Sequence, residues 1–439
     1  MTPSSAIAPS AAPPVPRTLD ETGLRLDLLV QLLVKTLHLS GDLSALDLAE
    51  RVGLTYPVIE PVIEQLKVQR LCEIIGGNAI GAPSYRYRIT DLGRERANLF
   101  LDRNMYTGLA PVPLDQYIRY MEAAWASAPR HHTREDVRAA FANLVLSARV
   151  IDQLGPAMNA RHSLFVYGPP GNGKTVIAQA VRNLMGGDFW IPYAIEVEGS
   201  LIRVFDQVNH QPISETASGL GLDASVTLDR RWIRCRRPSV TVGGELTLDH
   251  LELTYSKTSG FYRAPVQLLA NGGVLVIDDF GRQACSPHAL LNRWITPLES
   301  RVDYLTLQSG QKVGVPFHVL PVFATNIRPG DLVDEAFLRR IHYKVHAENP
   351  TPSEFTVIFE RVCADQDVPF DPAHVTFLLQ HVYKPKSLPL RGCQPRDLIS
   401  QALALAQYRG EPRALTPELL EAASTGYFVD EHDGVPRRP

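Results

Sequence analysis

The sequence is poor in cysteine, in long apolar runs and in excess charge of one sign, and each shortage excludes a class of protein. Its five cysteines are an odd number without paired spacing, which argues against a disulfide framework or a zinc site and favours a reducing compartment. No run approaches the roughly twenty apolar residues that span a bilayer, and the first residues lack the basic segment of a signal peptide. We therefore expect a cytoplasmic protein that does not insert into membranes.

The charge and the length limit the function and the architecture further. A net charge of −3 over 439 residues excludes a protein that coats nucleic acid with a generally basic surface, although it leaves room for a local patch. The hydrophobic share of 45% and the charged share of 21% are typical of a globular protein. Because one hydrophobic core stops growing well below this length, we expect two or three domains.

The strongest signal is a glycine-rich loop between an apolar run, Ser163 to Tyr167, and a segment with helical periodicity. Strand, loop and helix in this order are the context that a P-loop needs, whereas a plain glycine turn before a helix is the alternative. Its glycines let successive N–H groups point at a phosphate, the lysine would reach the β- and γ-phosphates, and the threonine hydroxyl would bind Mg²⁺. The loop consists of Gly168, Pro169, Pro170, Gly171, Asn172, Gly173, Lys174 and Thr175.

A second signal is the apolar run from Gly272 to Ile277, which ends in Asp278 and Asp279. Continuous apolar residues are typical of a parallel strand buried on both faces, and ligands bind at the carboxyl ends of such strands. This is the form of a Walker B element, in which Asp278 would hold Mg²⁺ and Asp279 would orient or deprotonate the attacking water. A strand end capped by a turn is the alternative, and it explains one aspartate more easily than two.

Two further segments lie downstream. Val322 to Asn326 has the pattern of another parallel strand, and Gln394 to Leu398 opens a helix. In this order the segments resemble the AAA+ ATPases over residues 131–410, which implies ATP as the nucleotide. The resemblance implies that Asn326 is the sensor-1 residue, between the P-loop strand and the Walker B strand. It also implies that Arg396 is the sensor-2 residue, which contacts the γ-phosphate from a helical lid.

The segment from Asp334 to Ile341 resembles the part of an AAA+ protein that delivers an arginine finger to a neighbouring subunit. The residue order of the segment resembles that of family members in which the second arginine acts, which favours Arg340, with Arg339 as the runner-up. The alternative is a helix end with two solvated arginines. A finger supplied in trans implies a homo-oligomer, most simply a hexameric ring or a helical assembly.

The chain departs from the common family pattern at Asp279, where many members have glutamate. Because aspartate is shorter, it must lie closer to the water or act less well as a base. We therefore expect hydrolysis to be slow. A slowly hydrolysing, nucleotide-dependent scaffold is one alternative function.

A hairpin pattern just before sensor 1, from Val302 to Val315, resembles the pre-sensor-1 insertion of MoxR proteins and sigma-54 activators. The GAFTGA loop of the activators is missing, since the nearest segment is Tyr255 to Phe261. The first functional hypothesis is therefore a MoxR-like ring ATPase that remodels a protein client.

The N-terminal part predicts three helices followed by a β-ribbon, an order that resembles a winged helix. Phosphate contacts usually dominate DNA affinity, but the third helix balances Glu60 and Glu64 against Lys67 and Arg70. The wing is more basic, which keeps a DNA-associated ATP switch as an alternative to a protein-docking module. Its arginines are Arg86, Arg88, Arg94 and Arg96.

The 104 positions between Lys174 and Asp278 exceed what one helix and one strand need, and therefore predict an insertion. On a strand, basic residues and one tryptophan of this insertion would share a face and could bind nucleic acid or an acidic peptide. The alternative is that they pair with acids across a subunit interface. These residues are Arg230, Trp232, Arg234 and Arg236.

Together these patterns predict an α/β protein with a parallel-sheet AAA+ core, an α-helical C-terminal lid and an N-terminal winged-helix (α+β) domain. The predicted boundaries are a disordered lead 1–19, a winged-helix-like domain 20–103, a linker 104–130, a core 131–348 with an insertion at about 200–262, a lid 349–429 and a tail 430–439.

Overall fold

The structure is a computed structural model that describes residues 11–77, 84–127, 131–213, 228–332 and 335–428. The chain divides into two compact units, each assembled from separate stretches of sequence. Unit 1 holds residues 1–130, 185–277 and 282–321, and unit 2 holds residues 131–184, 278–281 and 322–439. Among the residues described, none of the helices has the length and apolar character that crossing a bilayer requires.

One five-stranded sheet has the strand order β10-β13-β16-β5-β17. β10 pairs in parallel with β13, and both β16 and β17 pair in parallel with β5. β13 and β16 are buried along their whole length, as expected of strands covered on both faces. The predicted α/β parallel-sheet fold class is therefore confirmed. The strands are Leu164–Tyr167 (β5), Ser239–Val242 (β10), Val274–Ile277 (β13), Leu320–Thr325 (β16) and Tyr343–His346 (β17).

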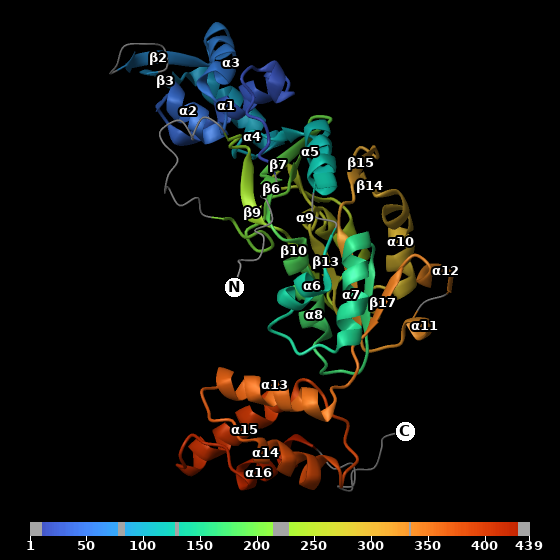
Figure 1. The fold of residues 1–439 in the computed structure, drawn as a ribbon. Coiled ribbons are helices and arrows are strands. Elements are labelled where there is room, and N and C mark those ends of the chain that lie inside the picture. Colours follow the sequence, from blue (N-terminus) through green and yellow to red (C-terminus); the bar gives the residue numbers. More distant parts are fainter. Residues whose placement is uncertain (1–10, 78–83, 128–130, 214–227, 333–334, 429–439) are drawn as a thin grey trace, which may run out of the picture. The chain divides into compact units, whose positions relative to one another are not determined.

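Before the C-terminal helices, unit 2 contains five helices among its described residues, which Figure 1 labels α6, α7, α8, α11 and α12. α8 begins at the end of the glycine-rich loop, so the loop joins the end of β5 to the start of a helix, as predicted. The helices are Arg134–Ala140 (α6), Ala148–Ala160 (α7), Lys174–Met185 (α8), Pro329–Leu332 (α11) and Glu335–Leu338 (α12).

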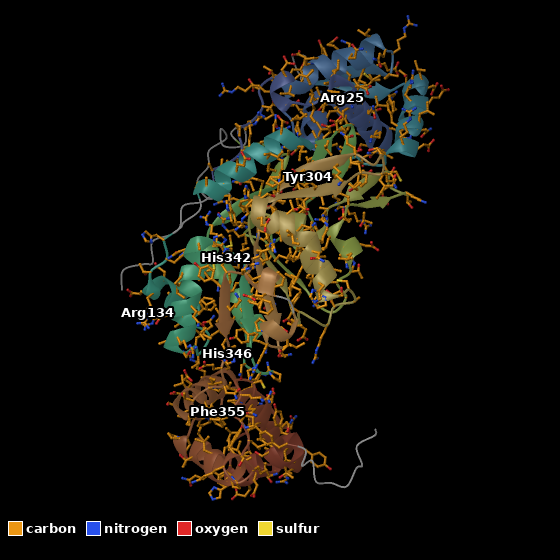
Figure 2. The ribbon with its side chains drawn as sticks, turned by 90° about the vertical axis from the view of Figure 1, so that its right-hand side faces the viewer. Arg25, Arg134, Tyr304, His342, His346 and Phe355 are labelled. Atoms are coloured by element: carbon orange, nitrogen blue, oxygen red, sulfur yellow. The ribbon has the colours of Figure 1, made fainter. Side chains whose placement is uncertain are left out.

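The C-terminal helices of unit 2 surround one apolar cluster and occupy the residues predicted to form the lid. The first of them, α13, begins with a capping box between Thr351 and Glu354 and with Pro352 in its first turn. Phe355, labelled in Figure 2, is fully buried in this cluster. The elements are Pro352–Asp365 (α13), Pro372–Phe377 (α14), the π-helix Leu378–Tyr383, Gln394–Arg409 (α15) and Pro417–Tyr427 (α16).

In unit 1, the N-terminal residues form three helices, a β-ribbon and a fourth helix around a sheet of order β1-β3-β2. Ser44 starts the second helix with a capping box, and Gly53 ends it with a left-handed backbone. The three helices and the ribbon lie where the sequence predicts them, and the likeness to a winged helix stays a prediction. The elements are Leu26–Ser40 (α1), Leu43–Ser44 (β1), Ala45–Val52 (α2), Tyr56–Val68 (α3), Cys72–Gly77 (β2), Tyr85–Ile89 (β3) and Asp91–Arg103 (α4).

The rest of unit 1 contains a second five-stranded sheet, β11-β12-β8-β7-β4, and two antiparallel pairs, β6–β9 and β14–β15. The β14–β15 pair is the hairpin that the sequence predicts before sensor 1. The elements are Val112–Pro113 (β4), Leu114–Ser127 (α5), Asp188–Pro192 (β6), Ala194–Val197 (β7), Ser200–Arg203 (β8), Trp232–Arg236 (β9), Thr254–Ser256 (β11), Phe261–Arg263 (β12), Val266–Leu269 (α9), Pro287–Ser300 (α10), Val302–Thr306 (β14) and Lys312–Pro316 (β15).

Three predicted boundaries differ from the structure. In the predicted linker, α5 buries Tyr117 in the core of unit 1. In the predicted insertion, β10 pairs with β13 in the parallel sheet. The sequence did not predict this pairing, because a short apolar run has no feature that distinguishes an inserted strand from a core strand. In the predicted disordered lead, Pro13 and Pro16 are buried, whereas residues 1–10 lie outside the described residues.

Candidate functional site

The glycine-rich loop follows β5 and wraps around the first turn of α8. Gly168 has a φ of +146°, and a Cβ there would lie 2.4 Å from the carbonyl oxygen of Ala347. Gly171 has a φ of +83°, and a Cβ there would lie 2.6 Å from Cys393 Sγ. Both positions therefore require glycine for backbone conformation and for space, which explains this part of the motif.

Lys174 and Thr175 stand at the N-terminal end of α8, where the partial positive charge of the helix favours an anion. The Lys174 side chain is buried, and its Nζ donates to the carbonyl oxygen of Pro169 at 2.8 Å. Burial lowers the pKa of Lys174, while the carboxylates of Asp279 and Asp278 oppose that shift. A phosphate oxygen would be a stronger acceptor for this ammonium than a peptide carbonyl, because it carries charge.

The structure brings the predicted polar residues together at the carboxyl ends of β13 and β16. The Thr175 hydroxyl lies 2.9 Å from each carboxylate oxygen of Asp278. Asn326 Nδ2 donates to Asp279 Oδ1 at 3.1 Å. Because β16 lies between β5 and β13, Asn326 has the position that the resemblance implied. Asp279 is exposed and has a φ of +47°, a left-handed backbone that aspartate tolerates better than most residues.

The residues around Thr175 and Asp278 fit Mg²⁺. Magnesium takes oxygen ligands, and proteins usually hold it with one or two carboxylates while water and substrate phosphates complete the shell. A hydroxyl and a carboxylate in contact provide that chemistry. Within the described part of the chain, no group of three or more His, Cys, Asp or Glu residues could form a cage made of protein alone.

The predicted residues line one cavity of about 520 Å³ in unit 2, a volume within the usual range of small-molecule sites. It reaches from the glycine-rich loop past Asp278, Asp279 and Asn326 to Arg396 of the lid. The sequence analysis missed its apolar wall, because the residues that form it come from two segments far from any motif. They are Leu144, Val145, Leu146, Ile358 and Val362.

The predicted arginines lie in different places. Arg396 lines the cavity from the first turn of α15, and its guanidinium also bonds Asp397 Oδ1 at 3.1 Å. Arg339 and Arg340 follow α12 and are not among the described residues that line the cavity. Arg339 is exposed, whereas Arg340 is half-buried and its carbonyl oxygen accepts a hydrogen bond from the Ser163 hydroxyl at 3.1 Å. The finger role of either residue stays a prediction.

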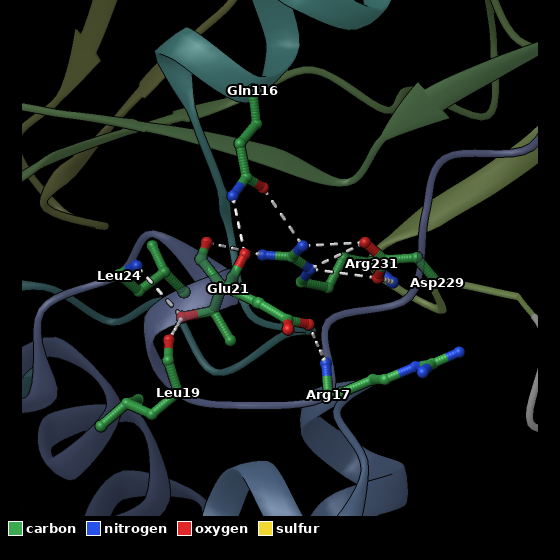
Figure 3. Close-up of polar contacts among 8 residues, drawn as sticks. Arg17, Leu19, Glu21, Leu24, Gln116, Asp229 and Arg231 are labelled. Carbon is green, nitrogen blue, oxygen red and sulfur yellow. Dashed lines mark hydrogen bonds and ion pairs between the residues drawn. The ribbon is translucent and has the colours of Figure 1, made fainter.

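The arginines of the predicted insertion make ion pairs within the chain. Arg231 and Asp229 form a buried pair at 2.8 Å, and Figure 3 shows the same guanidinium reaching Gln116. Arg234 pairs with Asp188. On the face that the sequence predicted to be basic, Trp232 is buried and Arg234 is half-buried, whereas Arg236 is exposed. The acids that pair with Arg230 and Arg234 belong to the same chain, and pairing across a subunit interface stays a prediction.

The same pairing extends to the N-terminal elements. Arg230 pairs with Glu50 on α2 at 3.1 Å, and Arg88 on β3 pairs with Asp42 at 2.7 Å. These partnered arginines belong to both basic surfaces on which the DNA alternative relied. Because an exposed ion pair contributes little free energy, these arginines stay accessible to solvent. Each of them nevertheless has an acidic neighbour that offsets its positive charge.

Known proteins resemble this chain in two ways, through a family model for the lid and through solved structures that match most of the chain. A family model described as "Domain of unknown function (DUF8689)" matches residues 351–425. No curated protein matches the sequence. Among solved structures, the RuvB Holliday junction branch migration motor of Thermotoga maritima is 14% identical, with 72% of this chain and 72% of that chain covered and a TM-score of 0.36. NtrX of Brucella abortus in complex with ADP is 14% identical, with 77% and 68% covered and a TM-score of 0.40. The fold assignment rests on this chain's own parallel sheet, in which β16 lies between β5 and β13 as the resemblance to AAA+ ATPases implied.

Proposed function

We propose that this chain is an ATP hydrolase of the AAA+ class. The observation that carries the proposal is the contact between Thr175 and Asp278 beside a buried Lys174, in a cavity that also contains the Asp279–Asn326 pair. Three separate motifs of the sequence supply these five polar groups, and phosphoryl transfer uses groups of these kinds.

Each group has a role in this proposal. The N–H groups of the loop and the Lys174 ammonium hold the phosphates, and the apolar wall of the cavity accepts the adenine base. Asp279 accepts a proton from the attacking water, and Asn326 orients that carboxylate or the water itself. Thr175 and Asp278 would hold Mg²⁺, which supplies positive charge next to the phosphates when bound.

We further propose that the active form is a homo-oligomer, most simply a hexameric ring or a helical assembly. Arg340 or Arg339 of one copy would complete the site of the next, so that hydrolysis depends on assembly. The exposure of Arg339 supports a role outside its own unit. The five cysteines are all free thiols, which supports a reducing, cytoplasmic location.

The client of this motor would be a protein or a protein complex. The β14–β15 hairpin supports the MoxR-like assignment, although its apolar side chains, such as Leu305 and Val313, are buried in unit 1. The net negative charge of α3 and the intramolecular pairs of Arg88, Arg230 and Arg234 weigh against DNA as the client.

The test is release of phosphate from ATP with Mg²⁺, compared between the wild type and Lys174→Ala. We expect the variant to lose turnover and to bind ATP weakly, because the loop loses its only charged phosphate ligand. A Lys174→Ala protein that binds and hydrolyses ATP like the wild type would refute the proposal. For the client, an Asp279→Asn chain held with ATP should retain a protein partner that the Lys174→Ala chain does not retain.

A further inference from the structure

The lid presents a preformed loop, residues 389–393, ahead of α15. Gln394, which is buried, shapes this loop from inside. Its Oε1 accepts from the backbone N–H of Arg391 at 2.7 Å and from the Tyr383 hydroxyl at 3.0 Å. Its Nε2 donates to the carbonyl oxygen of Pro389 at 3.3 Å. Because these bonds stay within the lid, they fix the shape of the loop from the lid's own residues.

This lid loop contacts the glycine-rich loop, residues 168–175, which is the phosphate loop of the proposed function. The contact uses one side chain and two backbone groups of the lid loop. Arg391 Nη1 donates to the carbonyl oxygen of Pro170 at 2.9 Å. The backbone N–H of Cys393 donates to the carbonyl oxygen of Gly171 at 2.8 Å. The backbone N–H of Gly392 donates to Asn172 Oδ1 at 3.1 Å.

Asn172 also holds the connecting segment, residues 347–349, which leads from β17 to the lid. Its Nδ2 donates to Asn349 Oδ1 at 2.8 Å and to the carbonyl oxygen of Ala347 at 3.3 Å. One side-chain amide therefore uses both of its donor hydrogens on the connecting segment and its acceptor on the lid loop. Among side chains of this length, only an amide offers donors and an acceptor in that arrangement.

We propose that Asn172 is a positioning residue that couples the phosphate loop to the lid, by joining the loop to the connecting segment and to the lid loop at the same time. The inference rests on the proposed function, because the signal it would transmit is occupancy of the loop by a nucleotide phosphate. A leucine at position 172 would keep the volume but none of the three bonds. An aspartate would keep the bond from Gly392 but would face the oxygens of Ala347 and Asn349 without a hydrogen to donate.

The direction of the coupling follows from the peptide units that the lid contacts. The carbonyls of Pro170 and Gly171 belong to the same peptide units as the N–H groups of Gly171 and Asn172, which point toward a phosphate in a P-loop. A phosphate that accepts from those N–H groups polarises the peptide units and makes their carbonyls stronger acceptors. Nucleotide binding should therefore tighten the hydrogen bonds from Arg391 and Cys393 and hold the lid more firmly.

Hydrogen–deuterium exchange of the full chain tests this, read from peptides that contain the amides of Gly392 and Cys393. Without nucleotide, Asn172→Leu should speed exchange there by about tenfold, the effect expected from losing a net hydrogen bond, and should leave α16 unchanged. At saturating ADP, exchange of these amides should slow in the wild type and respond less in the variant. Asn183→Leu is the matched control, because Asn183 makes an amide-to-carbonyl bond to Ala140 on the same unit, and this bond involves neither the lid loop nor the connecting segment.

The inference is overturned if Asn172→Leu leaves the exchange of Gly392 and Cys393 at the wild-type rate without nucleotide. It is also overturned if ADP slows their exchange equally in both chains. If the leucine chain does not fold, Asn172→Asp serves in its place; it keeps the acceptor for Gly392 but loses both bonds to the connecting segment, so exchange in peptides that cover residues 347–349 should speed up instead. A wild-type chain that binds no ADP would refute the proposed function instead, and the nucleotide-free comparison would still decide whether Asn172 holds the lid.

Discussion

The hydroxyl of Thr175 lies 2.9 Å from both carboxylate oxygens of Asp278, although 103 positions separate the two residues in the chain. One residue comes from the start of a helix and the other from the end of a buried strand. Their contact places two oxygen ligands of the kind that Mg²⁺ prefers at the edge of the cavity.

We predict that Asp278→Asn lowers ATP hydrolysis by about a hundredfold or more, because the loss of a charged magnesium ligand removes several kcal/mol of stabilisation. The measurement is phosphate release as a function of Mg²⁺ concentration. Thr175→Ser is the control, since it keeps the hydroxyl and should retain most of the activity. A hydrolysis rate in Asp278→Asn within threefold of the wild type, at equal Mg²⁺, would be incompatible with this assignment.

Asp279 has a left-handed backbone, and this predicts how its substitutions behave. Asparagine tolerates this conformation, so Asp279→Asn should fold normally and lose hydrolysis, because it cannot accept a proton. Asp279→Glu should cost about 1 kcal/mol of stability and should not raise the rate, since a longer side chain on a strained backbone does not reproduce the usual family geometry. Phosphate release and urea denaturation measure the two effects. A faster and equally stable glutamate variant would show that the backbone does not select aspartate here.

Hydrolysis by an assembled ring should depend on complementation between copies. Neither Lys174→Ala nor Arg340→Ala should hydrolyse ATP alone. An equal mixture should recover about one quarter of the wild-type sites, because half of the chains carry Lys174 and half of their neighbours carry Arg340. The same mixture with Arg339→Ala in place of Arg340→Ala identifies which arginine acts. If each arginine variant alone hydrolyses ATP at the wild-type rate, neither arginine acts as a finger in trans.

Lys35 predicts a pH dependence of unit 1. It is buried on α1, its Nζ donates to the carbonyl oxygens of Asn104 and Tyr106, and burial lowers its pKa to about 8. Between that pKa and its ordinary value the unfolded chain binds more protons than the folded chain. The free energy of unfolding should therefore rise with pH in this window, by roughly 1 kcal/mol per pH unit. Below about pH 8 Lys35 is protonated in both states, so it should add no dependence on pH there.

The variant Lys35→Met isolates this effect, because both chains share every other titrating group. We expect the difference in the free energy of unfolding between wild type and variant to grow in favour of the wild type from pH 8 to pH 10. Urea titration followed by tryptophan fluorescence measures it, since all four tryptophans lie in unit 1. Parallel pH profiles for the two chains would mean that the Lys35 pKa is not lowered by folding.

The motifs of the site could be predicted because each is a run of neighbouring residues. A phosphate loop needs glycine at positions such as Gly168 and Gly171 for local reasons of backbone angle and space, so its signature survives in a single sequence. The apolar runs before Asp278 and Asn326 are equally local, because burial on both faces leaves a continuous apolar stretch.

The partners of the predicted arginines could not be inferred in the same way. Arg230 meets Glu50 across 180 positions, and no property of either residue indicates the other. Arg231 lies beside Arg230 in the sequence, yet it is buried in an ion pair with Asp229, whereas Arg230 is exposed. A strand with alternating arginines has the same pattern whether the charges face solvent, a ligand or acids of the same chain.

The sequence by itself determined the phosphate loop, the two aspartates after a buried strand and the class of sheet that carries them, since these depend on residues adjacent in the chain. Only the tertiary structure decided that Asn172 meets Gly392 at a separation of 220 positions, that Thr175 meets Asp278, and that an apolar wall closes the cavity. Such contacts depend on how distant segments are packed, and the free energy of packing is spread over many side chains rather than encoded in any one motif.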